Sequence, residues 1–145
     1  MPGFDAHSER ELESLLTVGN GLIGVRGSLE EGIEESQPAT LLAGIFNRLP
    51  KTYDPPERLG ECPTLVVAPD WLRLSVTING ESLSIKNGEA YEHERILDLC
   101  QAAMIRRWRH RLPSGQMVRL VTLRAALFPD RHILIQRVWI QPEDF

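Results

Sequence analysis

Two Asn-Gly dipeptides, Asn79-Gly80 and Asn87-Gly88, constrain this fold more than any other feature of the sequence. Asn-Gly favours the type I′ turn, whose twist suits a two-residue β-hairpin. Apolar residues alternate with polar ones before the first turn and resume after it: Leu72, Leu74, Val76 and Ile78, then Leu83 and Ile85. Because this period of two is typical of a half-buried strand, the segment predicts an antiparallel meander.

Longer extended segments follow the second turn. We expect strands at residues 91–97, 102–112, 117–128 and 132–140. Pro113-Ser114-Gly115 and Pro129-Asp130-Arg131 separate the last three of these segments and favour turns. In this region apolar side chains occur at both odd- and even-numbered positions, which face opposite sides of a strand. This pattern indicates central strands that are covered in part on each face.

One short helix is expected near the N-terminus. Ser8-Glu9-Arg10-Glu11 fits a capping box, and Leu12, Leu15 and Leu16 have helical spacing. The helix should end before Gly19-Asn20-Gly21, since this tripeptide disfavours helical backbone. Residues 30–39 and 50–63 resemble loops. The predicted fold class is therefore mainly β, an antiparallel β-sandwich with one short N-terminal helix.

The length of 145 residues suits one domain over residues 1–145. The net charge of -4 gives no reason to expect nucleic acid as a partner. Charge is uneven, however, with a sum of -9 over residues 1–98 and +5 over residues 99–145. This asymmetry fits either two copies steered together or two differently charged faces of one fold.

Cys62 and Cys100 lack the spacing of a redox motif, so reduced thiols and a cytoplasmic location are expected. No apolar run approaches the roughly 20 residues that span a bilayer, and no membrane partner is expected.

Three sequence patterns favour non-catalytic interpretations. Residues 19–24 match GxGxxG, but no helix and no parallel βαβ unit can follow, so a glycine-rich strand entry is favoured over a nucleotide site. The four histidines are never at zinc-ligand spacing, and neither a metal nor a cofactor is expected. The paired glutamates Glu30-Glu31, Glu34-Glu35 and Glu92/Glu94 could supply glycosidase carboxylates, but solvated loop positions are favoured.

Basic and aromatic side chains give two further candidates. Alternation places Arg106, Trp108 and His110 on one face of a strand and Arg107, Arg109 and Arg111 on the other. This combination could bind phosphate or stack on a base. A row of three arginines on a solvent face is favoured, an interdomain salt-bridge surface comes next, and nucleic-acid binding comes last. Asp70 and Trp71 precede the clearest alternation, where the indole could either stack on a sugar or cap the core.

Several ordered segments resemble glycoside hydrolase family sixty-five, the maltose, trehalose and kojibiose phosphorylases. The resembling segments are residues 13–28, 40–46, 67–72, 78–81 and 95–99. The resemblance implies the N-terminal part of a β-supersandwich of the galactose-mutarotase kind. In this family the catalytic residues lie in a following helical toroid, where bound inorganic phosphate is the co-substrate, so no catalytic residue is carried over to this chain.

The resemblance implies a non-catalytic domain that supports the toroid. Half of a two-layer β fold leaves an apolar sheet face and unpaired edge groups in water, so we expect a homodimer through a sheet face or edge. From the aromatic side chain at a strand end we further expect Asp70 and Trp71 near the mouth of a disaccharide cleft. The chain would be about half of the family's sandwich domain. Two other hypotheses stay open: a stand-alone carbohydrate-binding module and a small mutarotase-like enzyme.

Overall fold

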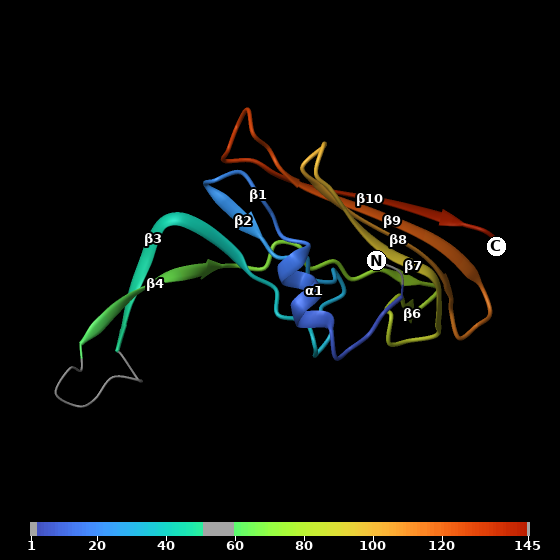
Figure 1. The fold of residues 1–145 in the computed structure, drawn as a ribbon. Helices are drawn as coiled ribbons and strands as arrows, with labels where there is room; N and C mark the ends of the chain where they lie inside the picture. The colour runs from blue at the N-terminus through green and yellow to red at the C-terminus, as the bar shows by residue number, and fades with distance from the viewer. Residues whose placement is uncertain (1–2, 51–59, 145) are drawn as a thin grey trace.

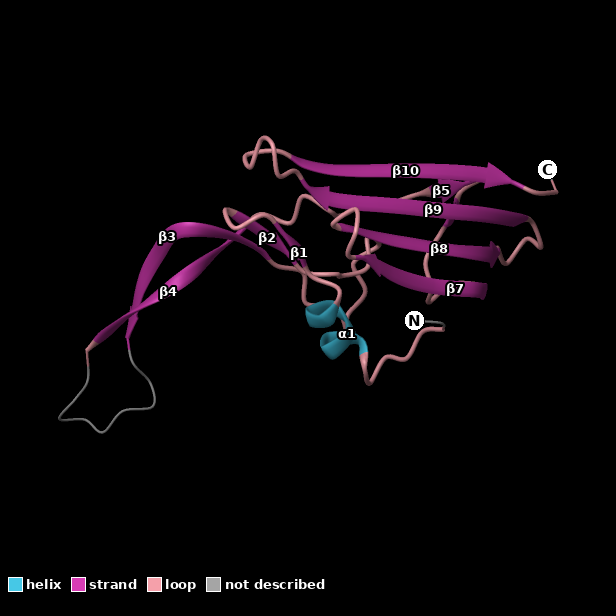
Figure 2. Ribbon diagram, turned by 45° about the horizontal axis from the view of Figure 1, so that its top comes forward, coloured by secondary structure: helices cyan, strands magenta, loops and turns pink. Residues whose placement is uncertain are grey.

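The structure is a computed structural model that describes residues 3–50 and 60–144. Within these residues it contains two four-stranded antiparallel sheets, a two-stranded sheet and one short helix (Figures 1 and 2). The predicted fold class, an antiparallel β architecture with one N-terminal helix, is confirmed.

The larger sheet is formed by the C-terminal strands in the order β10-β9-β8-β7. These strands are β7 (Glu89–Asp98), β8 (Ala103–Arg111), β9 (Met117–Ala126) and β10 (Leu134–Pro142). All neighbours pair antiparallel, as the turn signals between them predict. One face of this sheet, which we call the inner face, packs against the N-terminal half; the opposite side is the outer face.

The second sheet follows the order β1-β2-β3-β4. Its strands are β1 (Val18–Gly19), β2 (Ile23–Val25), β3 (Thr40–Pro50) and β4 (Glu61–Ala68). The β3–β4 hairpin projects away from the rest of the molecule (Figure 1). A loop was expected over residues 50–63. Pro50 is instead the last residue of β3, residues 61–63 belong to β4, and residues 51–59 lie outside the described residues.

The prediction of a full strand at residues 72–78 is wrong. Only β5 (Thr77–Ile78) pairs, with β6 (Glu81–Ser82), around the expected Asn79-Gly80 turn. The alternating burial is nevertheless present, because this segment crosses the inner face of the large sheet. Its backbone bonds to a loop instead of a strand, since the Leu74 N–H donates to the Glu30 carbonyl at 2.8 Å.

Helix α1 (Glu9–Leu15) ends where the sequence predicts, but of its expected apolar stripe only Leu16, directly after the helix, is buried. Glu9 and Glu13 are buried, whereas Leu15 is 65% exposed. The capping box is also absent, because the Ser8 hydroxyl donates to Asp5 instead of capping the helix. Both glutamates bond to groups on other segments, which explains their burial.

Two apolar clusters fill the inner face. One joins Leu16, Val18, Ile23, Val25, Leu72 and Met104. The other joins Leu83, Trp108, Leu112, Val118 and Leu120. Among the described residues, no helix combines the length and the apolar character needed to cross a bilayer.

Candidate functional site

Asp70 and Trp71 lie in the segment that returns from the projecting hairpin. Asp70 is exposed, and its Oδ1 accepts a hydrogen bond from the Leu72 N–H at 3.2 Å. Trp71 is half-buried and packs against the first apolar cluster. The indole therefore contributes to the core, and a role of either residue in sugar binding stays a prediction.

The inner face contains a buried ionic cluster, so the prediction that Glu30 and Glu31 are solvated is wrong. Glu30 accepts hydrogen bonds from Arg106 at 2.7 Å, Arg124 at 2.5 Å and the Thr122 hydroxyl at 2.6 Å. Arg106 also donates to Glu31 at 2.5 and 2.9 Å. Burial alone would raise the pKa of Glu30, but the Arg124 and Arg106 guanidinium groups hold it well below its usual range.

His93 joins this cluster to the N-terminal segment. Its Nε2 accepts a hydrogen bond from Arg106 Nε at 3.0 Å, and its Nδ1 lies 2.8 Å from the Gly3 carbonyl. A carbonyl oxygen can only accept, so Nδ1 carries the proton and the ring is neutral. Burial and the adjacent Arg106 lower the pKa of His93 to about 4. The cluster is thus a closed structural network and leaves no carboxylate available for chemistry.

The glycine-rich motif of residues 19–24 is a structural turn. The Asn20 side-chain amide donates to the Leu127 and Arg131 carbonyls at 2.7 and 3.0 Å. Its Oδ1 accepts from the Leu22 and Ile23 N–H groups at 3.0 and 2.9 Å. This arrangement ties the β1–β2 turn to the β9–β10 connection, in agreement with a glycine-rich strand entry.

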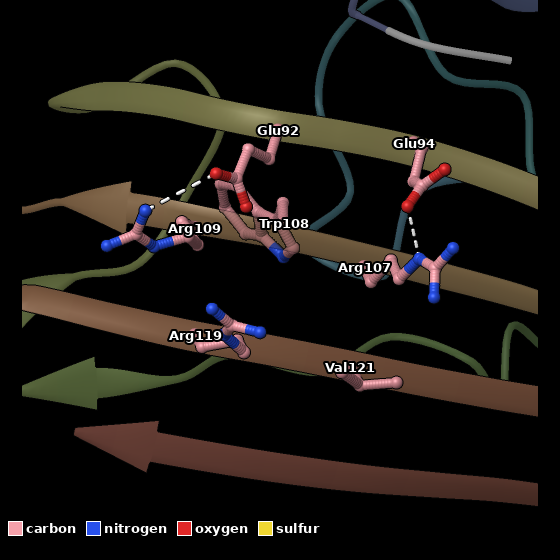
Figure 3. A pocket seen from close by; sticks show the side chains of 7 residues that line it. All are labelled: Glu92, Glu94, Arg107, Trp108, Arg109, Arg119 and Val121. Atoms are coloured by element: carbon pink, nitrogen blue, oxygen red, sulfur yellow. Dashed lines mark hydrogen bonds and ion pairs between the residues drawn. The ribbon is translucent and has the colours of Figure 1, made fainter. Parts of the chain in front are cut away.

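The outer face contains the best candidate binding pocket, and a β-bulge creates it. Between Tyr91 and Glu94 the register of β7 shifts, so that Glu92 and His93 both lie opposite Trp108. Glu92 has a left-handed φ of 49°. A bulge of this kind re-aims a side chain. It leaves His93 buried and places both carboxylates, Glu92 and Glu94, on the outer side (Figure 3).

Arginines from β8 and β9 complete this pocket, which has a volume of about 320 Å³. The ion pairs are Arg107 with Glu94, Arg109 with Glu92 at 3.3 Å and with Glu143 at 2.7 Å, and Arg119 with Glu143 at 3.2 Å. Hydrogen bonds from Arg109 lower the pKa of Glu143, and the same bonds raise the pKa of Arg109. The expected row of outward arginines is present, but glutamates neutralise it.

This geometry fits binding better than catalysis. A glycosidase acid must remain protonated, whereas each carboxylate in the pocket faces a guanidinium group. Over residues 3–50 and 60–144, no group of three or more potential ligand side chains could hold a metal ion. The pocket therefore offers fixed hydrogen-bond donors and acceptors, without an acid–base pair.

The sequence singles out Glu92 and Glu94 as candidate carboxylates but does not connect them with the arginines. One signal could have predicted this site: the strands expected at residues 91–97 and 102–112 are consecutive, and the first carries glutamates where the second carries arginines. The β-bulge could not be predicted from the sequence, because no residue type distinguishes the extra residue of a bulge from an ordinary strand residue.

Fold and pocket together define a β-sheet domain that has a closed ionic interior and a polar surface site. The sequence matches the family described as "Glycosyl hydrolase family 65, N-terminal domain" over residues 1–145. The chain belongs to this family.

Individual relatives agree with this assignment. A kojibiose phosphorylase from Caldanaerobacter subterraneus subsp. tengcongensis is 32% identical over 92% of this chain and 16% of its own length. An uncharacterized glycosyl hydrolase from Mycobacterium leprae is 32% identical over 90% of this chain and 17% of its own. The chain thus spans about one sixth of the curated relatives it matches.

A solved structure named "Putative kojibiose phosphorylase from human microbiome" has the same fold. It superposes with a TM-score of 0.85 over 97% of this chain and 19% of its own, at 16% identity.

Proposed function

We propose that this chain is the non-catalytic N-terminal β domain of a disaccharide phosphorylase or related glycoside hydrolase, acting in carbohydrate metabolism. Its role is to support a catalytic region formed by further polypeptide, with inorganic phosphate as co-substrate if that region is a phosphorylase. The cytoplasm is the compartment we expect, since both described cysteines are free thiols.

The exposed β3–β4 hairpin is the observation that carries this proposal. Its large apolar side chains are between 42% and 56% exposed: Ile45, Phe46, Leu49, Leu65 and Val67. Phe46 and Leu65 are cross-strand partners and so share one side of the ribbon. A two-stranded hairpin is marginal in water by itself. Further polypeptide that covers it would stabilise it, and the matched relatives are about six times longer than the region they share with this chain.

The catalytic part of the proposal is tested by assaying the purified 145-residue chain. Kojibiose, maltose and trehalose should remain intact with or without inorganic phosphate, because the pocket lacks an acid–base pair. Release of glucose or glucose phosphate above a matched blank would overturn the non-catalytic assignment.

A homodimer through a sheet face or edge is part of the same proposal. Exposed apolar side chains and an unpaired strand edge both favour association. Light scattering should show a dimer that dissociates on dilution, whereas a monomer at every concentration would contradict it. Replacing Phe46 and Leu65 by serine tests whether the hairpin contributes, with Leu99→Ser as the control because Leu99 is exposed elsewhere.

Asp70 and Trp71 remain the proposed contribution to a sugar cleft. Trp71→Ala in an intact enzyme should weaken disaccharide binding if the indole faces that cleft. An unchanged KM would assign Trp71 to the core alone.

A further inference from the structure

The outer-face pocket is charge-balanced, which restricts what it can bind. The lining contributes three positive charges, from Arg107, Arg109 and Arg119, and two negative charges, from Glu92 and Glu94. Glu143, which pairs with Arg109 and Arg119 from outside the lining, supplies the third negative charge. A phosphate or a cation would gain little from a site whose own charges cancel. A neutral ligand with many hydroxyl groups fits better, because each hydroxyl can donate to a carboxylate and accept from a guanidinium group.

Two of the arginines keep donors available. Arg107 and Arg119 each use only Nε in the ion pairs and hydrogen bonds within the described part of the chain. Their terminal nitrogens are therefore open to a ligand, and both side chains line the pocket (Figure 3). Val121 lies beside them and provides an apolar patch for the C–H groups of a sugar ring.

The backbone of the pocket is held in a costly conformation. Glu92 has φ 49°, a region that non-glycine residues rarely adopt. Strain of this kind often accompanies a binding or catalytic site. Here the strained residue adds a second carboxylate to the outer face, directly beside Arg109.

The volume agrees with a small ligand. At about 320 Å³ the pocket lies at the lower end of the range for small-molecule sites, roughly 300–1,000 Å³. We propose that this pocket, formed by the β7 bulge and the arginines of β8 and β9, is a weak binding site for a neutral oligosaccharide. The site is on the outer face, whereas Trp71 packs on the inner-face cluster, so the two do not form one site.

The proposal is tested on the purified chain by NMR chemical-shift titration with kojibiose and maltose. We expect saturable shifts at millimolar sugar for backbone amides around residues 92–94, 107–109 and 119–121. The shifts should persist in high salt, and inorganic phosphate should neither reproduce nor abolish them. No saturable shift with either disaccharide, or binding of phosphate in place of sugar, would overturn the proposal.

Variants then locate the site. Arg119→Met and Arg107→Met should each weaken sugar binding about tenfold, because each removes a charged hydrogen-bond donor. Arg111→Met is the matched control, since Arg111 lies on the same strand face and pairs with Glu89 outside the pocket. Equal affinity in all three variants would exclude this pocket.

Glu92→Gly separates binding from structure. Glycine accepts a positive φ without strain, so this variant should be at least as stable as the parent chain. It should nevertheless bind sugar about tenfold more weakly, because one carboxylate is lost. Unchanged binding would contradict the proposal, and this result is independent of whether the chain is catalytic.

Discussion

The two faces of the β7–β10 sheet use the same residue types in opposite ways. On the inner face, Arg106 and Arg124 are 0% and 1% exposed and share Glu30. On the outer face, Arg107 pairs with Glu94 while its side chain stays 54% exposed. Adjacent arginines on one strand thus have different physical roles, and the difference is set by which side of the sheet each faces.

Burial sets the cost of removing one partner of an ion pair. A buried charge that loses its partner is strongly destabilising, whereas exposed pairs contribute about 0–1 kcal/mol. The inner cluster therefore fixes how the N-terminal half packs on the sheet. The outer pairs leave their surface available for binding.

The largest expected effect comes from Arg106→Met compared with Arg107→Met. Loss of Arg106 leaves Glu30 and Glu31 short of a buried counter-charge and should cost about 3–5 kcal/mol of unfolding free energy. Loss of Arg107 should cost less than about 1 kcal/mol. Urea denaturation followed by tryptophan fluorescence measures both values, and equal costs would refute the contrast between the faces.

The second prediction concerns acid sensitivity at His93. Its pKa is about 4 in the folded protein and near 6.5 when unfolded, so the ring is neutral in both states well above pH 6.5. As the pH falls from 6.5 towards 4, the unfolded state binds the proton first and stability drops by up to about 3 kcal/mol.

His93→Gln is the control for this pH dependence. A glutamine amide can donate to Gly3 and accept from Arg106 without titrating. Stability measured between pH 6.5 and 4.5 should therefore fall less steeply in the variant. A smaller slope remains from His110, whose pKa is also lowered by burial. An unchanged slope would assign the acid sensitivity to groups other than His93. The lower limit excludes Glu30, whose depressed pKa affects stability only below about pH 4.5.

A smaller effect is expected for Asn20→Ala, which removes the amide that joins the β1–β2 turn to two carbonyls. About 2 kcal/mol of stability should be lost, because two carbonyls and two backbone N–H groups lose their partner, the buried Ile23 N–H among them. Asn47 on the exposed hairpin is the comparison, and Asn47→Ala should change stability by less than about 0.5 kcal/mol. Thermal melting of both variants measures this difference in stability. Similar melting temperatures would show that the Asn20 side-chain hydrogen bonds do not stabilise the fold.

The smallest difference is expected between two glycines of the segment 13–28. A Cβ at Gly27 would lie 2.5 Å from Leu16 Cβ and 2.9 Å from its carbonyl oxygen, whereas one at Gly24 meets nothing within 4 Å. Gly27→Ala should cost about 1–2 kcal/mol through overpacking. Gly24→Ala should be close to neutral. Differential scanning calorimetry that ranks Gly24→Ala as the more harmful change would contradict this packing.

Much of the sheet was predictable because its signals are local. Turns at Pro113-Ser114-Gly115 and Asn79-Gly80 are present where the sequence places them, and alternation correctly separated Arg106 from Arg107. The strand expected at residues 72–78 failed for a physical reason. Alternating burial requires a covering surface on one side of the segment but does not require a neighbouring strand. Here that surface is the sheet that the segment crosses.

The site was less predictable than the fold. Glu30 and Glu31 occupy a segment without periodicity, so nothing local distinguished them from solvated glutamates. The bulge at Glu92 depends on how β7 pairs with β8, which the sequence of either strand does not specify.

The sequence by itself determined the local geometry: where the chain turns, where it extends, and that one helix precedes the sheets. Tertiary structure decided which charges are buried, because Glu30 and Arg106 are 76 residues apart and meet only when the N-terminal half packs on the sheet. It also decided which carboxylates remain at the surface, since one inserted residue in β7 turns Glu92 outward. Turns and strand periodicity depend on neighbouring residues, whereas the environment of a charge depends on long-range packing.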